Sequence, residues 1–339
     1  MLARHQADGA RLITIAGLGG VGKTHLARAF ADVAVSPGGV FFLDLSPVND
    51  AAGLWRQIAA GLGVSLEAEP MAQLGDALEA RGRALVILDN AEQIIAPLAE
   101  AVSFWGRAAP EITLLVTSRE ALRVSGEVLL SLSPLPLPPD TSCLDVLSQS
   151  PSVGLFVRRA TRAWPGFALS EDNAGAVAAI CGRLEGLPLA IELAASRVPV
   201  LSPAEILQRL SLALLSTRQR GIPPRHQTLQ AALSGSWRLL SEAERAVLVC
   251  VSTFPGHFTL AAAEAVAGRD DTLEALSGLV EKNLVRVEAG HPRRLTLYAC
   301  VREFCDEHRA GNSILWERFI AHHIQRVHTE PSRLHDAAP

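Results

Sequence analysis

The stretch AGLGGVGKTHLA, residues 16–27, limits the possible folds of this chain more than any other segment. The residues before it, RLITIAG, form an apolar and β-branched run that predicts a buried strand. The residues after it carry apolar side chains at helical spacing, with Leu26, Phe30 and Val33 expected on one buried face. Strand, glycine-rich turn and helix, in this order, are the context in which a Gly-x4-Gly-Lys-Thr pattern binds phosphate. The sequence therefore predicts an α/β fold with a nucleotide site at the end of its first strand.

The residue types of this turn suit a polyphosphate. Glycines let backbone N–H groups point inward as a nest for phosphate oxygens, and the positive end of the following helix adds to the attraction. Lys23, one of only two lysines in the chain, would bring a compact charge to the β- and γ-phosphates. Thr24 would offer its hydroxyl to Mg2+. The alternative is a plain glycine turn before a helix. The residues expected to contact nucleotide are Gly17, Gly19, Gly20, Val21, Gly22, Lys23, Thr24 and His25.

A second apolar strand, residues 84–88, ends in Asp89. In a parallel sheet this carboxylate would lie beside the phosphate loop, where we expect it to hold Mg2+ through water together with Thr24. The alternative role for Asp89 is that of a helix cap. Asn90 stands where many ATPases carry a second carboxylate that activates water, and a neutral amide cannot accept that proton. The sequence therefore predicts slow hydrolysis, with Glu92 as the alternative acid.

A third strand, EITLLVTSRE, leads into Arg119. The Arg119 guanidinium is expected to sense or stabilise the γ-phosphate, and the alternative is an exposed arginine on a loop. The residues expected to act in catalysis are thus Lys23, Asp89 and Arg119. Further strands at residues 39–46 and 127–133 give five strands with helices between them. This inventory predicts an α/β P-loop NTPase fold, a three-layer sandwich around a mainly parallel sheet.

Several segments resemble, in order, the NB-ARC class of STAND signalling ATPases, especially its bacterial predicted-ATPase and regulator branch. Its Walker A, Walker B and sensor segments are similar to GLGGVGKT, LVILDNAEQ and LLVTSREALRVSGE. The resemblance continues through LEGLPLAIELAASRV, RHQTLQAALSGSWRLLSEAERAVL and LTLYACVREF, and covers about nine-tenths of the chain. It implies that the chain binds ATP or ADP with Mg2+, that Lys23 and Thr24 hold phosphate and metal with Asp89, and that Arg119 senses the γ-phosphate.

The resemblance also implies that Pro188, in the GLPLA motif, lies against the adenine. The residues themselves favour a helix start here, because Gly186 can end the preceding helix and Pro188 suits the first turn of the next one. A packing role alone is the alternative to an adenine contact.

Composition shifts divide the chain. The proline-rich residues 133–142 cannot continue a sheet interior and read as a semi-rigid connector. Residues 153–215 show helical patterns that predict a module able to close over nucleotide as a lid. Residues 225–310 combine helices with a hairpin pattern, NLVRVEAGHPRRLTLYA, which indicates a winged helix, as the resemblance also implies. The predicted organisation is a P-loop domain at 1–140, a helical lid domain at 141–220, a winged-helix domain at 221–311 and a C-terminal helix at 312–339.

Two features depart from the resembled family. Leu297, Tyr298 and Ala299 stand at a triplet whose histidine, in that family, touches the β-phosphate of ADP, so the ADP-bound off state is expected to be loose or held by other contacts. The first ten residues also show no counterpart of an upstream Gly-Arg-Glu segment that helps to hold adenine, which leaves nucleotide affinity and the choice between ATP and GTP open.

The C-terminal helix is interpreted as the start of helical repeats. Its expected buried stripe is Trp316, Phe319, Ile320, His323 or Ile324, and Val327.

Charge and cysteine content narrow the partners and the compartment. The net charge of −4 at pH 7 argues against a surface that seeks nucleic acid, and residues 225–310 hold ten Arg or Lys against eleven Asp or Glu. Direct DNA binding is therefore disfavoured. No run approaches the roughly 18 apolar residues of a membrane span, and five cysteines without framework spacing indicate a reducing cytoplasm. A zinc site of Cys300, Cys305 and His308 is disfavoured, because residues 300 and 305 point in different directions on a helix. A metal role of His322, His323 and His328 is also disfavoured, because they are expected on the surface of a helix.

The favoured hypothesis is a nucleotide-operated switch. Exchange of ADP for ATP would rearrange the modules and expose a surface for self-association, with an unidentified signalling protein as partner. The alternative is a DNA-binding winged-helix transcriptional regulator with a vestigial P-loop. A motor-type AAA+ ATPase is disfavoured because Asn90 replaces the second acid and no arginine finger is identified.

Overall fold

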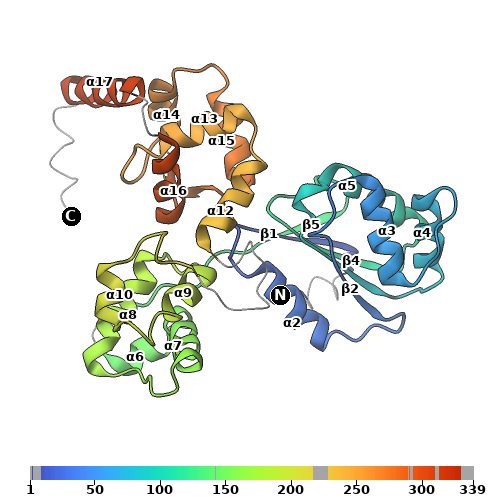
Figure 1. The fold of residues 1–339 in the computed structure, drawn as a ribbon. Coiled ribbons are helices and arrows are strands. Elements are labelled where there is room, and N and C mark those ends of the chain that lie inside the picture. Colours follow the sequence, from blue (N-terminus) through green and yellow to red (C-terminus); the bar gives the residue numbers. More distant parts are fainter. Residues whose placement is uncertain are drawn as a thin grey trace. The chain divides into compact units, whose positions relative to one another are not determined.

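The structure is a computed structural model of the chain. It describes residues 2, 9–141, 143–216, 228–288, 290, 293–309 and 313–329, without the side chains of residues 313, 314, 323 and 325–329. The chain splits into two compact units, Met1–Ser133 and Pro134–Pro339, coloured from blue to teal and from green to red in Figure 1. The finer division into four predicted domains stays a prediction.

The first unit is built on a parallel sheet with the strand order β2-β3-β4-β1-β5. Its strands are β1 (Leu12–Ala16), β2 (Val40–Asp44), β3 (Leu85–Asp89), β4 (Thr113–Ser118) and β5 (Glu127–Ser131). Its helices are α2 (Lys23–Val33), α3 (Ala51–Leu62), α4 (Pro70–Glu79), α5 (Ile95–Ala108) and the short 3-10 helix η1 (Ala91–Gln93). The prediction of five strands in a mainly parallel sheet is confirmed.

Alternate side chains of each strand point to opposite faces of the sheet and build two cores. On β3, Leu85 and Ile87 belong to the core that includes Phe30 of α2. The alternate residues of the same strand, Val86 and Leu88, belong to the core formed with α3, α4 and α5. Strands that are buried on both faces appear in a sequence as continuous apolar runs, and such runs located β1, β3 and β4. The first unit thus has helices on both faces of the sheet, as predicted (Figure 1).

Helix α2 buries a different set of residues from the predicted one. Ala27 and Phe30 are buried and Leu26 is half-buried, but Val33 is 73 % exposed. Val33 is the last residue of the helix, and its exposure shows that contact with the sheet ends one turn earlier. The prediction that Val33 is buried is therefore wrong.

The strand order reverses around β1. This strand lies between β4 and β5, whereas β2, which follows it in sequence, is at the far edge of the sheet. In open parallel sheets, ligands bind beyond the carboxyl ends of the strands at such a reversal. The glycine-rich turn comes directly after β1, so the topology places it at this position.

The connection between the units is bonded on both sides. The N–H of Leu132 donates to the carbonyl of Ala16 at 2.7 Å, within the first unit. In the second unit, the N–H of Leu135 donates to the carbonyl of Gly186 at 3.0 Å. The predicted connector, residues 133–142, is therefore attached to the second unit from Leu135 onward rather than extended in solvent; residue 142 lies outside the described part.

The second unit is helical apart from one hairpin. Its first helices are α6 (Leu144–Ser148), α7 (Pro151–Ala163), α8 (Glu171–Arg183), α9 (Pro188–Ala195) and α10 (Pro203–Gln208). The later elements are α12 (Leu229–Arg238), α13 (Glu242–Val251), α14 (Leu260–Ala267), α15 (Thr272–Glu281), β6 (Val285–Glu288), β7 (Arg294–Leu297), α16 (Ala299–Arg309) and α17 (Ser313–Thr329). In the described residues, no helix combines the length and the apolar character that crossing a membrane requires.

Strands β6 and β7 form the predicted hairpin. They pair antiparallel from Val285 opposite Leu297 to Glu288 opposite Arg294. Residues 289, 291 and 292 of the turn lie outside the described part.

Helix α17 also turns a different face inward from the predicted one. Leu315 is buried and Phe319 packs edge-on against Phe254, with ring centroids 5.3 Å apart. Trp316 and Ile320 are 45 % and 52 % exposed, and Ile324 is exposed as well. The predicted stripe is thus wrong at Trp316, Ile320 and Ile324, because α14 and the segment around Phe254 contact the neighbouring face. The side chains of residues 323 and 327 lie outside the described part, so the prediction is not tested there.

Lys282, the second of the two lysines, forms a nearly buried ion pair in the second unit. Its ammonium lies 2.6 and 2.7 Å from the two carboxylate oxygens of Glu244. The two side chains are 18 % and 9 % exposed. Glu244 also accepts the N–H of Ser241 and completes the cap of α13.

We expect Glu244→Gln to lower the free energy of unfolding by about 2–3 kcal/mol, because it leaves the Lys282 ammonium without a counter-charge in a poorly solvated position. Urea denaturation followed by tryptophan fluorescence measures this change. Asp271→Asn, which breaks the exposed pair with Arg269, is the matched control and should have no measurable effect. Equal effects of the two substitutions would contradict the expectation.

Candidate functional site

The turn between β1 and α2 has a shape that only glycine permits at two positions. Gly22 has φ of 105°, in the left-handed region, and directly precedes α2. A Cβ on Gly17 would lie 2.7 Å from the carbonyl oxygen of Leu132. Helix α2 begins without a side-chain cap, so its first N–H groups are not satisfied by a capping side chain. This is the arrangement expected of an anion-binding helix start.

Lys23 folds back under the turn. Its ammonium donates to the carbonyl of Gly17 at 2.7 Å and to that of Leu18 at 3.2 Å. Burial lowers the pKa of Lys23 to about 8; the charge of Glu92 opposes this effect, and that of Arg119 adds to it. Among the residues that the structure describes, this ammonium donates to backbone carbonyls alone, so an anionic ligand in the turn would offer it a stronger partner.

Asp89 lies at the tip of β3, 1 % exposed, and three side chains donate to it. Its Oδ1 accepts from Thr24 at 2.9 Å and from Thr117 at 2.5 Å, and its Oδ2 accepts from Asn90 at 2.8 Å. Burial raises the pKa of Asp89, the hydroxyls of Thr117 and Thr24 oppose the shift, and the nearby Asp44 adds to it. The structure therefore brings the two predicted metal-site residues, Thr24 and Asp89, into contact. A hydroxyl and a carboxylate side by side are hard oxygen donors that fit Mg2+.

Two further residues of this cluster had no role in the sequence analysis. Thr117 links β4 to Asp89 and also accepts the backbone N–H of Asn90 at 2.9 Å. Asp44 lies opposite Asp89 at the end of β2, and its Oδ1 accepts from Asn90 at 3.1 Å. The signal available in the sequence was a polar residue directly after an apolar strand, the same signal that located Asp89.

Asn90 is a structural link in this cluster. It has φ of 65°, and its side-chain amide donates to the carboxylates of both Asp44 and Asp89. Its backbone N–H donates to Thr117. These contacts hold the ends of β2, β3 and β4 together, and they use Asn90 as a donor rather than as a proton acceptor.

Arg119 follows β4 and pairs with Glu92 of η1. The guanidinium Nε lies 3.1 Å from Glu92 Oε1, and each side chain is 11 % exposed. Arg119 is therefore not the exposed loop residue of the alternative interpretation. Of the other predicted contacts, Val21 is buried and His25 is exposed on α2.

A protein-family model described as an AAA domain matches residues 5–123, which contain all of this cluster. The protein Rv0894 of Mycobacterium tuberculosis H37Rv is 35 % identical over 296 residues, which cover 84 % of this chain and 72 % of Rv0894. The chain belongs to the family of Rv0894. Because the chain carries an AAA-type P-loop ATPase domain, its fold implies nucleotide binding, typically with Mg2+.

A longer relative and a solved structure extend the comparison. Rv0890c of the same strain, named as a candidate HTH-type transcriptional regulator, is 37 % identical over 314 residues. These cover 89 % of this chain but 34 % of Rv0890c, so the chain spans about a third of that relative. The Walker-type ATPase PABY2304 of Pyrococcus abyssi is 16 % identical with a TM-score of 0.56, covering 89 % of this chain and 93 % of that one, which shows a shared fold.

Pro188 lies in the second unit of this Rv0894-family chain. It occupies the first turn of α9, as predicted, after Gly186 with φ of 70°. A Cβ on Gly186 would lie 2.0 Å from the carbonyl oxygen of Leu135, so packing alone requires glycine here. An adenine contact by Pro188 stays a proposal.

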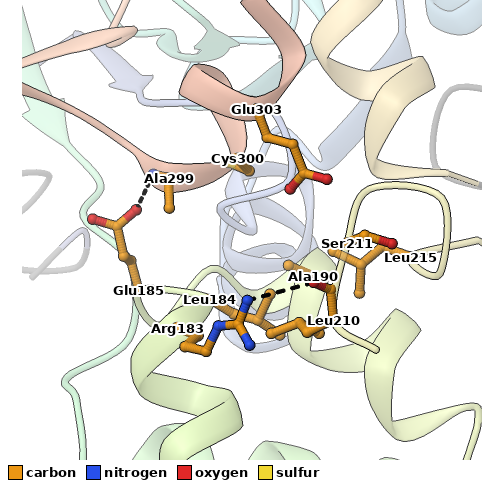
Figure 2. A pocket seen from close by; sticks show the side chains of 10 residues that line it. All are labelled: Arg183, Leu184, Glu185, Ala190, Leu210, Ser211, Leu215, Ala299, Cys300 and Glu303. Atoms are coloured by element: carbon orange, nitrogen blue, oxygen red, sulfur yellow. Dashed lines mark hydrogen bonds between the residues drawn. The ribbon is translucent and has the colours of Figure 1, made fainter. Parts of the chain in front are cut away.

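Glu185, just before Gly186, joins this turn to the hairpin and α16. Its carboxylate lies 2.6 Å from Arg286 on β6 and accepts the N–H of Ala299 at 2.5 Å, the contact dashed in Figure 2. Arg286 in turn lies over the ring of Tyr298, 4.3 Å from its centroid. Tyr298 and Ala299, two of the three residues that the sequence analysis compared with the NB-ARC triplet, are therefore linked to the Gly186 turn through the carboxylate of Glu185, a residue with φ of 48°.

A cavity of about 80 Å3 lies next to these contacts, lined by the end of α8, α9, the segment after α10 and the start of α16 (Figure 2). It is smaller than the roughly 300 Å3 of typical ligand pockets. Cys300 lines it, and burial raises the pKa of both Cys300 and Cys305 to about 12, which keeps these thiols protonated. Among the described residues, no three His, Cys, Asp or Glu side chains cluster as a metal ligand set.

We expect polyphosphate binding at Lys23 to take up a proton at alkaline pH. The lowered pKa of about 8 means that the nucleotide-free lysine is protonated at neutral pH and deprotonated above that value, and phosphate oxygens raise the pKa again. The affinity for Mg-ATP should therefore fall as the pH rises above about 8. Calorimetry in two buffers of different ionisation enthalpy should show proton uptake at about pH 9 and little at about pH 7; equal uptake at both would contradict this assignment.

We expect Thr117→Val to weaken Mg2+ binding with ATP by about three- to tenfold at mildly acidic pH. The hydroxyl of Thr117 lowers the pKa of Asp89, so its loss raises that pKa further and favours the protonated acid, which competes with the metal. Titration of Mg2+ at fixed ATP measures the change, and binding of metal-free ATP should stay the same.

Thr14→Val is the matched control for that substitution. Thr14 is buried on β1, and its hydroxyl has no hydrogen-bond partner among the described residues. Replacing it by a methyl group should raise the free energy of unfolding by about 1 kcal/mol and leave the Mg2+ titration unchanged. A loss of Mg2+ affinity in this variant as well would contradict a specific role for Thr117.

Proposed function

We propose that the chain is an ATP/ADP-binding regulatory switch with slow ATP hydrolysis. The observation that carries the proposal is the contact of Thr24 with Asp89 at 2.9 Å, beside Lys23 under the glycine turn. In this arrangement Lys23 would hold the β- and γ-phosphates, Thr24 and Asp89 would hold Mg2+, and Arg119 would meet the γ-phosphate. The contacts of Asn90 support slow turnover, on the order of 10⁻⁴ to 10⁻² per second as in unassisted switch NTPases.

The proposal includes transmission from nucleotide to the second unit. Helices α6 to α10 would act as a lid, with Pro188 against the adenine, and the elements from α12 to α16 would act as a winged helix. Glu185 supports this route, since it is bonded to Arg286 and to Ala299 while lying three residues before Pro188. Each nucleotide must bind one of two conformations more tightly than the other, because equal affinity for both leaves their populations unchanged. We propose that the ATP-bound conformation self-associates and engages a signalling protein.

The second candidate is a DNA-binding transcriptional regulator with a vestigial P-loop. The name of Rv0890c favours it. The charges do not, because several basic residues of the later helices and the hairpin are paired with carboxylates in the structure. These are Arg269, Lys282, Arg286 and Arg309. Phosphate contacts need unneutralised basic groups.

Identification of bound nucleotide tests the proposal. We expect ATP or ADP to be released from the purified, Mg-ATP-incubated chain on denaturation, and to be absent from Lys23→Ala. Arg56→Ala, which removes an exposed positive charge from α3 of the same unit, should retain nucleotide. Equal nucleotide occupancy in the original chain and in Lys23→Ala would contradict the proposed nucleotide site. Salt-sensitive binding to duplex DNA that ignores Mg-ATP would favour the second candidate.

Self-association is measured separately by light scattering. The mass in solution with a non-hydrolysable ATP analogue should exceed the mass with ADP, and Lys23→Ala should show no difference between the two nucleotides. An identical mass in both nucleotide states would contradict the proposed self-association without affecting nucleotide binding.

A further inference from the structure

One carboxylate oxygen beside the P-loop has no partner. Glu92 Oε2 is buried and accepts no hydrogen bond from any residue that the structure describes. The other oxygen, Oε1, lies 3.1 Å from Arg119 Nε. An unpaired buried acceptor costs stability, and in native proteins it calls for a functional explanation.

The backbone conformation after β3 determines the position of the Glu92 carboxylate. Asn90 takes a left-handed conformation, η1 follows with Ala91 fully buried, and the turn packs against β4. Glu92 is thereby turned back toward Arg119 instead of into solvent. Among the charges that act on Lys23, the charge of Glu92 is the strongest, which agrees with a position beside the phosphate-binding ammonium.

The other two carboxylates at this sheet edge, Asp89 and Asp44, already accept hydrogen bonds that hold the strand ends. Asp89 accepts hydrogen bonds from three side chains at the tip of β3. Asp44 accepts from the N–H of Ser46 and from Asn90. Glu92 is thus the carboxylate in this part of the described structure that has an oxygen open to a new donor.

We propose that Glu92 is the general base of ATP hydrolysis at this site; the inference rests on the proposed function. A water donates a hydrogen bond to Glu92 Oε2, and its oxygen forms a bond to the γ-phosphorus while its proton passes to the carboxylate. The bond from the γ-phosphorus to the bridging oxygen breaks, and its electron pair stays on ADP, where Lys23 neutralises the charge. Asn90 keeps the strand ends in place and takes no proton.

The ion pair with Arg119 makes the action of Glu92 as a base dependent on a bound γ-phosphate. Without a γ-phosphate its guanidinium holds Glu92 Oε1, which limits where the carboxylate can move. A γ-phosphate competes for the same guanidinium through charge-assisted hydrogen bonds. The pair would then loosen only when the triphosphate is bound, so the base is released by its own substrate.

Glu92→Gln, which keeps the size and removes the proton acceptor, tests the proposal in the full chain. We expect single-turnover hydrolysis to slow by about 100-fold, while the dissociation constant for Mg-ATP stays within about threefold. The second readout is the nucleotide itself: after incubation with Mg-ATP, this variant should hold mainly ATP and the original chain mainly ADP. Glu79→Gln, an exposed glutamate at the end of α4, is the matched control and should behave like the original chain.

Rescue of hydrolysis by added formate distinguishes a proton-accepting role of Glu92 from a purely structural one. Glu92→Ala leaves space beside Arg119, and formate should partly restore hydrolysis in Glu92→Ala but not in Lys23→Ala. Unchanged hydrolysis in Glu92→Gln, or loss of ATP binding in it with a normal circular dichroism spectrum, would overturn the role of Glu92 alone. If the original chain binds no nucleotide, the proposed function fails and this inference fails with it.

Discussion

The buried carboxylate of Asp89 is the constraint on which the nucleotide-binding unit depends. A charged group that is almost fully removed from water needs partners, and here they come from α2, from β4 and from the residue after β3. Satisfying this one side chain fixes the start of α2 relative to the strand tips. The turn between β1 and α2 then has little freedom left, since Gly17 is pressed against the Leu132 carbonyl. The shape of the phosphate-binding turn is thus a consequence of how a buried acid is satisfied.

The same logic explains the resting state of the basic groups. In the described part of the chain, Lys23 donates to the carbonyls of Gly17 and Leu18, and Arg119 is paired with Glu92. These are substitute partners of lower charge density than a triphosphate. Both side chains are already held by these contacts, so binding of a polyphosphate would exchange their partners and order little that is free.

The sequence predicted β1, β3 and β4 because a strand buried on both faces is a continuous apolar run, and Asp89 and Arg119 come at the ends of such runs. The edge strands β2 and β5 are only partly buried, but their apolar residues also marked them. The sequence could not single out Asp44 or Thr117, since that requires knowing that β2 and β4 flank β3. The buried faces of α2 and α17 were misjudged at Val33 and Trp316 for a related reason. Apolar periodicity shows that a helix has a buried face, but the neighbouring elements decide where that face begins and ends.

The connection between the two units has a mechanical consequence. Leu132 is fastened to Ala16 on one side and Leu135 to Gly186 on the other, so only Ser133 and Pro134 lie between the fastened points. Proline fixes its own φ torsion and restricts the residue before it. The junction therefore has few rotatable backbone bonds. Because the segment between the two hydrogen bonds is so short, reorientation of one unit relative to the other would require rotation about the torsions of these two residues.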